Sequence, residues 1–349
     1  MIEIKKISVK IVNLISEIDE FKGKWEVVKN LAPDRLSVLK RVATIASVGS
    51  STRIEGSHLS DIQVEQLLTN IPAASFGSRD EEEVAGYAEA MNTIFDSYQS
   101  IAITENYIKQ FHSILLQFSS KDKRHKGEYK KMPNSVEAFD NHGNSIGVIF
   151  KTATPFETPI KMERLIEWFN RAMQEGTVHP LIIIALFIVN FLAIHPFQDG
   201  NGRLSRIITT LMLLQNGYIY VPYCSLESII EENKEQYYFT LRSAQKTIGT
   251  DYSTMEDWLL FFCTCLKKQK DILFQRMEKE KLISHTELPD LSREILSVAK
   301  TRNRITISDI VSYTQANRNT IKKHLRSLVR DKFLIQHGRG KGSWYVRGD

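Results

Sequence analysis

The sequence has few cysteines and few residues that interrupt regular structure. Its 349 residues include three cysteines, nine prolines and 17 glycines. Cys224, Cys263 and Cys265 are odd in number and form no Cys-x-x-Cys pair, so they support neither a disulfide framework nor a zinc site. We expect three reduced, partly buried thiols, which suits a cytoplasmic protein.

Long hydrophobic runs are also missing. The most apolar run, residues 181–194, is too short to cross a bilayer and contains Asn190, so it predicts a buried core helix. Residues 1–10 mix charged with apolar side chains, unlike a secretory signal. We therefore expect no membrane span, no export and a cytoplasmic location.

Positive charge is concentrated at one end of the chain. Residues 291–349 contain 13 lysines and arginines against four acidic residues, whereas the formal net charge of the whole chain is +5. The rest of the chain is therefore slightly acidic. A basic C-terminal part indicates contact with nucleic acid or another polyanion, and a solvated basic surface is the alternative.

Most of the sequence shows the three- and four-residue apolar spacing of helices. We predict helices over residues 36–48, 62–68, 82–98, 105–118, 159–173, 181–194, 204–214 and 255–281. The chain is longer than a single core usually supports, and the polar segment 284–290 marks a boundary. We expect a mainly α protein with an N-terminal helical region (1–100), a central domain (101–283) and a C-terminal domain (291–349).

One segment predicts β-structure instead. Residues 134–150 contain two short apolar runs around Asp140-Asn141-His142-Gly143-Asn144, the pattern of a β-hairpin. This hairpin lies about fifty residues before the loop that begins at His195. It is either a flap over that loop or an ordinary surface hairpin.

A dense group of polar and glycine residues follows the apolar run. Gly200, Asn201 and Gly202 form a tight turn into the next helix, and free amides at a helix N-terminus bind phosphate oxygens. Arg203 and Arg206 are three residues apart, so both can reach the same polyphosphate.

Two further side chains supply chemistry beside this turn. Asp199 offers the hard oxygen ligand that Mg²⁺ prefers. His195 has an ordinary pKa near neutrality and is the natural acceptor for a proton from an attacking hydroxyl. Each residue alone has a purely structural explanation, but together they predict phosphoryl or nucleotidyl transfer.

The run HPFQDGNGRLSR, residues 195–206, resembles the signature of Fic-domain proteins, and the resemblance extends over residues 45–268. It implies a mainly helical fold and the transfer of AMP from Mg·ATP to a Ser, Thr or Tyr hydroxyl of a target protein. By this resemblance His195 is the general base, Asp199 the Mg²⁺ ligand and Phe197 the packing anchor of the loop. The residues assigned to the phosphates are Gly200, Asn201 and Gly202 for the α-phosphate and Arg203 and Arg206 for the outer ones. Gly202 follows the AMP-transferring pattern, because a kinase-like branch carries Lys there.

The segment 51–56, Ser-Thr-Arg-Ile-Glu-Gly, predicts a helix end with Gly56 at its C-cap. It also resembles the inhibitory motif of one Fic class, which lies N-terminal to the catalytic loop. That resemblance implies that Glu55, on the same helix face as Ser51, pairs with Arg206 and displaces the γ-phosphate. The alternative is an exposed glutamate at a helix end, a place that the helix dipole disfavours.

The resemblance extends to the hairpin and the nucleotide pocket. It implies that residues 134–150 bind a target's backbone as an added strand and present its hydroxyl. Tyr238 matches an adenine-contacting tyrosine, although a core aromatic explains it nearly as well. Gln245 departs from the Asn of some relatives.

The C-terminal part predicts helices over 291–299, 308–313 and 318–329, followed by strands at 334–335 and 344–346. This order resembles a winged helix, with Arg339 and Lys341 at the tip of the wing. Residues suited to the DNA major groove gather on its third helix: Arg318, Asn319, Lys322, Lys323 and Arg326. A protein-interaction or dimer-orienting role is the alternative.

Two classes of function follow. The first is a self-inhibited protein adenylyltransferase that uses ATP and Mg²⁺ and modifies a target hydroxyl, including its own. The second is a DNA-binding regulator that uses the Fic body as a nucleotide sensor. Removal of AMP from targets by the same loop is a third possibility, and relatives with an inhibitory helix often form homodimers.

Overall fold

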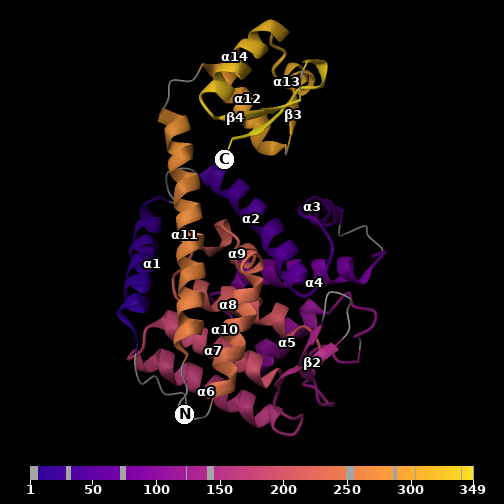
Figure 1. The fold of residues 1–349 in the computed structure, drawn as a ribbon, viewed down its shortest axis with the longest axis vertical. Coiled ribbons are helices and arrows are strands. Elements are labelled where there is room, and N and C mark those ends of the chain that lie inside the picture. The colour runs from indigo at the N-terminus through magenta and orange to yellow at the C-terminus, as the bar shows by residue number, and fades with distance from the viewer. Residues whose placement is uncertain are drawn as a thin grey trace. The chain divides into compact units, whose positions relative to one another are not determined.

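The computed structural model describes residues 7–28, 33–70, 76–122, 124–139, 145–248, 255–285, 289–302, 304–338 and 340–348 (Figure 1). The chain divides into two compact units, residues 1–274 and 275–349. Helices make up most of both, which confirms the mainly α prediction. In the described part of the chain, no helix combines the length and apolarity needed to span a membrane.

The first unit begins with five helices: α1 (Val9–Val28), α2 (Pro33–Ile54), α3 (Asp61–Asn70), α4 (Arg79–Ser97) and α5 (Glu105–Leu115). Helix α2 packs against α3, α4, α8 and α9, which carries its C-terminal end into the middle of the unit. It ends before Gly56, whose φ of +109° is the left-handed conformation that glycine adopts most easily.

The unit continues with six more helices: α6 (Thr158–Glu175), α7 (Pro180–Ile194), α8 (Asn201–Gln215), α9 (Leu226–Glu232), α10 (Lys234–Thr247) and α11 (Glu256–His285), which contains the division at 274/275. A short 3-10 helix, η3 (Val221–Tyr223), connects α8 to α9. Helix α7 contacts α6, α8 and α10 and buries every apolar residue from Leu181 to Leu192, as its composition predicted. Its one polar interruption is satisfied, because Asn190 Nδ2 donates to Leu186 O at 2.8 Å.

The predicted hairpin is present. Strands β1 (Ser135–Phe139) and β2 (Ser145–Lys151) pair antiparallel, with Ser135 opposite Lys151 and Phe139 opposite Ser145. Its tip, residues 140–144, lies outside the described residues, as do the side chains of 135–151.

The second unit has its own core. It contains α12 (Asp290–Thr301), α13 (Ile307–Thr314) and α14 (Arg318–Arg330), with strands β3 (Ile305–Thr306), β4 (Leu334–His337) and β5 (Trp344–Arg347) in the order β3-β5-β4 and the 3-10 helix η4 (Gly340–Gly342). The three helices and the two longer strands were predicted. Strand β3 was missed because two residues give no alternation to detect. Arg339 and the side chain of Lys341 lie outside the described residues.

Candidate active site

The site is built on the connection between two buried helices. Helix α7 ends at Ile194, and His195 follows it with a φ of 53°, its N–H donating to Phe191 O at 2.9 Å. Gly200, with a φ of 77°, caps the N-terminus of α8. Because α7 and α8 are fixed in the core, the residues between them are held in one place.

Phe197 anchors the loop in the core. It is fully buried and stacks on His112 of α5, with ring centroids 3.8 Å apart. Asn201 closes the loop on itself: its Oδ1 accepts from Phe197 N–H at 2.9 Å and its Nδ2 donates to Phe197 O at 2.8 Å. The Asn201 side chain therefore shapes the loop, and only its backbone N–H is available to an anion.

His195 is poised as a neutral imidazole. Burial, together with the positive charge of Lys130, lowers its pKa to about 4. Its Nδ1 lies 3.4 Å from Leu192 O, an acceptor that favours the tautomer with hydrogen on Nδ1. In that tautomer Nε2 carries the lone pair and can accept a proton.

Asp199 lies among positive groups. Its Oδ2 is 2.6 Å from Arg79 Nη2, its Oδ1 is 3.4 Å from Arg203 Nη2, and Oδ1 accepts from Gly200 N–H at 2.6 Å. Burial opposes ionisation, but these partners outweigh it and hold the Asp199 pKa below its ordinary value. The group is therefore a carboxylate at neutral pH, as a divalent-cation ligand must be.

A cation at Asp199 would need further ligands. Within the described ranges, no three His, Cys, Asp or Glu side chains come together in a metal-binding group. Mg²⁺ prefers six oxygens and keeps waters and phosphates as ligands, so one carboxylate beside an anion site fits a Mg·nucleotide rather than a resident metal.

The two arginines of α8 point to different partners. Arg203 is 2% exposed and its Nη1 lies 3.0 Å from Glu83 Oε2 of α4. Arg206 is 4% exposed; its Nε donates to Ser51 Oγ at 2.8 Å and its Nη2 to Ser51 O at 2.9 Å. The same Nη2 donates to Glu55 Oε1 at 2.8 Å. Burial favours the neutral form of Arg206, but Glu55 outweighs it and raises the guanidinium pKa.

Glu55 also lies against the N-terminus of α8. A Cβ placed on Gly202 would overlap Glu55 Oε1, so the carboxylate fills the space that a side chain at 202 would need. The helix end predicted to bind a phosphate thus faces an anion from another part of the chain. Ser51 and Glu55 thus both contact Arg206.

The predicted nucleotide-pocket residues lie on α10. Tyr237 is buried, and its ring lies 5.2 Å from that of the partly exposed Tyr238. Burial, and secondarily the Glu55 charge, raises the Tyr238 pKa, so Tyr238 shares the electrostatic environment of Glu55. Gln245 is buried on the same helix.

Four residues of the site were not found from the sequence: Arg79, Glu83, His112 and Lys130. None belongs to a motif, and each reaches the loop from a helix or a connection distant in the chain. His112 is the clearest case, since it is a lone histidine in α5 with no signal beyond the burial of its helix face.

The predicted DNA-binding residues lie in the second unit. Arg318, Asn319, Lys322, Lys323 and Arg326 are all exposed on α14. The opposite face is apolar and fully buried: Ile321, Leu325 and Leu328.

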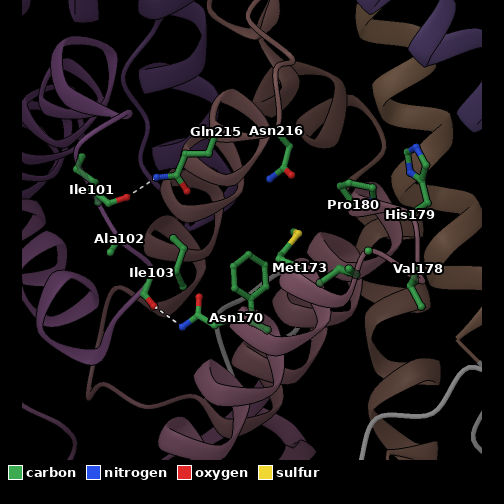
Figure 2. A pocket seen from close by; sticks show the side chains of 13 residues that line it. Ile101, Ala102, Ile103, Asn170, Met173, Val178, His179, Pro180, Gln215 and Asn216 are labelled. Carbon is green, nitrogen blue, oxygen red and sulfur yellow. Dashed lines mark hydrogen bonds between the residues drawn. The ribbon is translucent and has the colours of Figure 1, made fainter.

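A separate cavity of about 640 Å³ lies between α6, the start of α7 and the end of α8 (Figure 2). Two of its polar side chains bond to backbone: Asn170 Nδ2 donates to Ile103 O at 3.1 Å, and the Gln215 amide donates to Ile101 O. None of the predicted site residues lines it.

Comparison with known proteins gives matches for this region. Residues 102–213 match the family model described as the Fic/DOC family. A protein of Drosophila mojavensis named protein adenylyltransferase Fic is 26% identical over 262 residues, which cover 74% of this chain and 46% of that protein. The chain thus spans less than half the length of this relative.

Solved structures show the same fold. A Fic family protein from Desulfovibrio desulfuricans superposes with a TM-score of 0.63 at 21% identity, covering 98% of this chain and 97% of that one. A Fic domain containing signaling protein from Bacteroides thetaiotaomicron gives a TM-score of 0.62 at 25% identity, covering 75% and 97%.

Proposed function

We propose that this chain, which carries a Fic domain, transfers AMP from ATP to a hydroxyl of a protein and is held inactive by Glu55. The observation that carries the proposal is the loop at 195–206, where a neutral imidazole, a carboxylate and the N-terminus of a buried helix meet within one turn. The curated relatives named as adenylyltransferases support the same reaction at the level of the family.

The reaction assigns one role to each group. A target hydroxyl oxygen forms a bond to the α-phosphorus as the bond to pyrophosphate breaks, and His195 Nε2 takes the hydroxyl proton. The free N–H groups at the start of α8 stabilise negative charge on the phosphate. Asp199 would hold the Mg²⁺ that accompanies the nucleotide and neutralises phosphate charge.

The two arginines of α8 have different roles in this proposal. Arg206 points to the N-terminus of α8 and would hold an outer phosphate once Glu55 leaves. Arg203 is bound to Glu83 and to Asp199, so in this state it orients the carboxylate. We therefore assign the outer phosphate chiefly to Arg206.

Autoinhibition follows because the Glu55 carboxylate and an outer phosphate of ATP compete for the Arg206 guanidinium. Glu55 binds Arg206 Nη2 and fills the space beside Gly202. An ATP whose phosphates lie at the N-terminus of α8, here called the phosphate cradle, therefore loses a phosphate contact. The Glu55 side chain is 32% exposed, so it can move away from Arg206 towards solvent. Arg206 itself is held in place by two hydrogen bonds to Ser51.

The test is the intact mass of the purified protein after incubation with Mg·ATP. Wild type should gain little, Glu55→Gly should gain AMP, and Glu55→Gly with His195→Ala should gain none. Glu55→Gln is the matched variant, because it keeps the shape but removes the charge that Arg206 binds. Equal labelling of wild type and Glu55→Gly would contradict the brake, and no labelling of any variant would contradict the transferase.

The same samples test AMP removal. If Glu55 orients a water molecule for hydrolysis, the AMP-modified wild type should lose its label faster than the AMP-modified Glu55→Gln variant. A label that is stable in both would leave transfer as the single activity of the loop.

The target is proposed to bind along the hairpin β1–β2. An extended segment can add to its free edge through backbone hydrogen bonds, which would align a hydroxyl with His195 and leave the target's sequence largely unread.

A second function is favoured by the surface of α14. Its exposed polar and basic residues include the five predicted ones and lie away from a buried apolar face, the arrangement of a helix that inserts into the major groove. Fluorescence anisotropy with duplex DNA should show binding that weakens steeply with salt and is lost in Lys322→Glu with Lys323→Glu. His195→Ala should leave that binding intact, which separates the regulator from the enzyme.

A further inference from the structure

Lys130 is a buried ammonium beneath the His195 loop. It is 4% exposed, and its Nζ donates to Asn134 Oδ1 at 2.7 Å, Thr152 Oγ1 at 2.9 Å and Ile194 O at 3.1 Å. An ammonium has three N–H donors, so these three neutral oxygens satisfy it fully. Burying a charged group costs free energy, so a buried ammonium at this position points to a specific role.

The carbonyl groups on both sides of His195 bond to this one residue. Ile194 O accepts from Lys130 Nζ, and Pro196 O accepts from Lys130 N–H at 2.9 Å. His195 has a left-handed backbone, which is unfavourable for a residue with a Cβ. Lys130 supports this backbone from both directions, through the peptide that precedes His195 and through the peptide between Pro196 and Phe197.

The same cluster holds the roots of the hairpin. Asn134 directly precedes β1 and Thr152 directly follows β2, and Thr152 Oγ1 donates to Asn134 O at 2.7 Å. Asn134 Nδ2 in turn donates to Phe197 O at 2.9 Å. The ammonium thus joins both ends of the hairpin to the loop that carries the proposed base.

We propose that Lys130 is a positioning residue for AMP transfer, which couples the hairpin that would present the target hydroxyl to the backbone that aims His195. This inference rests on the proposed function. Lys130 reaches neither His195's ring nor the phosphate cradle, so its effect is on the geometry of transfer and not on nucleotide binding.

Electrostatics act in the same direction. Burial lowers the pKa of Lys130 to about 8, so it remains mostly charged at pH 7. Of the charged groups around His195, Lys130 lowers its pKa and Glu55 and Asp199 raise it. Lys130 therefore favours the neutral imidazole in addition to fixing its backbone.

The experiment uses the full chain with Glu55→Gly, in which transfer is measurable. Lys130→Met should lower kcat for AMP transfer by about 100-fold, the cost of a displaced reacting group. The dissociation constant for a Mg·ATP analogue, measured by calorimetry, should stay within about threefold. Lys130→Arg should recover much of kcat because it retains the charge and donors. Lys131→Met, at the exposed neighbouring position, should match the parent.

Three results would overturn the inference: kcat of Lys130→Met close to that of the parent, a parallel loss of nucleotide binding, or no rescue by Lys130→Arg. If Lys130→Met does not fold, Thr152→Val tests the same cluster by removing one acceptor, and it should lower kcat with unchanged nucleotide binding. A parent that binds Mg·ATP but transfers no AMP would instead refute the proposed function itself.

Discussion

Arg79 Nη2 lies 2.6 Å from Asp199 Oδ2, so the carboxylate predicted to bind a divalent cation already has a guanidinium partner. The two side chains come from positions 120 residues apart. Arg79 also pairs with Glu83, through Nε and Oε1 at 2.8 Å, and Glu83 pairs with Arg203. A chain of alternating charges thus runs from α4 to the start of α8.

Removing Arg79 should therefore favour the cation. We predict that Arg79→Ala tightens the binding of Mn²⁺, measured by electron paramagnetic resonance with a non-hydrolysable ATP analogue. A partly exposed ion pair contributes up to about 1 kcal/mol, so the gain is roughly fivefold at most. Arg41→Ala is the control, since it removes an exposed pair with Glu65 at 3.2 Å. Weaker Mn²⁺ binding by Arg79→Ala would mean that Arg79 assists the nucleotide.

His112 should make the free energy of unfolding depend on pH. Its Nδ1 accepts from Gly127 N–H at 2.9 Å and its Nε2 lies 3.0 Å from Asp199 O, so the native contacts need the neutral ring. Burial lowers its pKa to about 4, whereas an unfolded histidine titrates near 6.5. The unfolded chain binds the proton first, so stability is full above about pH 6.5 and falls as pH drops towards 4.

The shift at His112 corresponds to a loss of about 3 kcal/mol over that range, and His195 adds a loss of the same sign. Urea unfolding at pH 7.5 and pH 4 measures it. His112→Gln should be less stable at pH 7.5 but should lose less on acidification than wild type. The exposed His58, replaced by Gln, serves as control. An unchanged pH dependence in His112→Gln would refute the assignment.

Gly202→Ala distinguishes inhibition by Glu55 from phosphate binding at the N-terminus of α8. The added Cβ would overlap Glu55 Oε1 and so disturb its contact with Arg206. It would also crowd the helix end where we propose that a phosphate binds, so we predict weaker Mg·ATP binding and no activation, unlike Glu55→Gly. Calorimetry and intact mass measure the two effects. Activation of Gly202→Ala to the level of Glu55→Gly would show that the cradle has room for a methyl group.

Gly86→Ala tests the packing that positions the loop. Helices α4 and α5 approach so closely there that a Cβ would overlap Leu115 O, a backbone atom that cannot rotate away. We predict a loss of roughly 1–3 kcal/mol in the free energy of unfolding. Gly23→Ala in α1 is the matched control: no atom lies within 4 Å of its Cβ, and it should stabilise by about 0.5–1 kcal/mol. Equal effects of the two changes would contradict the close approach.

Local patterns predicted much of this molecule. The apolar run identified α7, and the four-residue spacing of Ser51 and Glu55 placed both on one face of the chain where α2 ends. The glycine-rich turn between His195 and Arg206 predicted the connection to α8. These features were accessible because each depends on residues within one or two helical turns.

The partners of that loop were not accessible. Arg79, His112 and Lys130 contact it from other parts of the chain, and nothing in their own neighbourhood distinguishes them from surface or core residues. Arg203 shows the same limit, because its proximity to the turn suggested a phosphate ligand, whereas packing of α4 on α8 gives it Glu83 as a partner.

The sequence by itself therefore determined the groups that the loop offers: an imidazole, a carboxylate, a helix N-terminus and two guanidinium groups in fixed order. Only the tertiary structure decided what each group faces. The reason is physical, since chemical identity and helical periodicity are local, whereas the electrostatic partner of a buried group depends on which helix surfaces pack together. Arg79 at Asp199, Glu83 at Arg203 and Lys130 beneath His195 are all results of that packing.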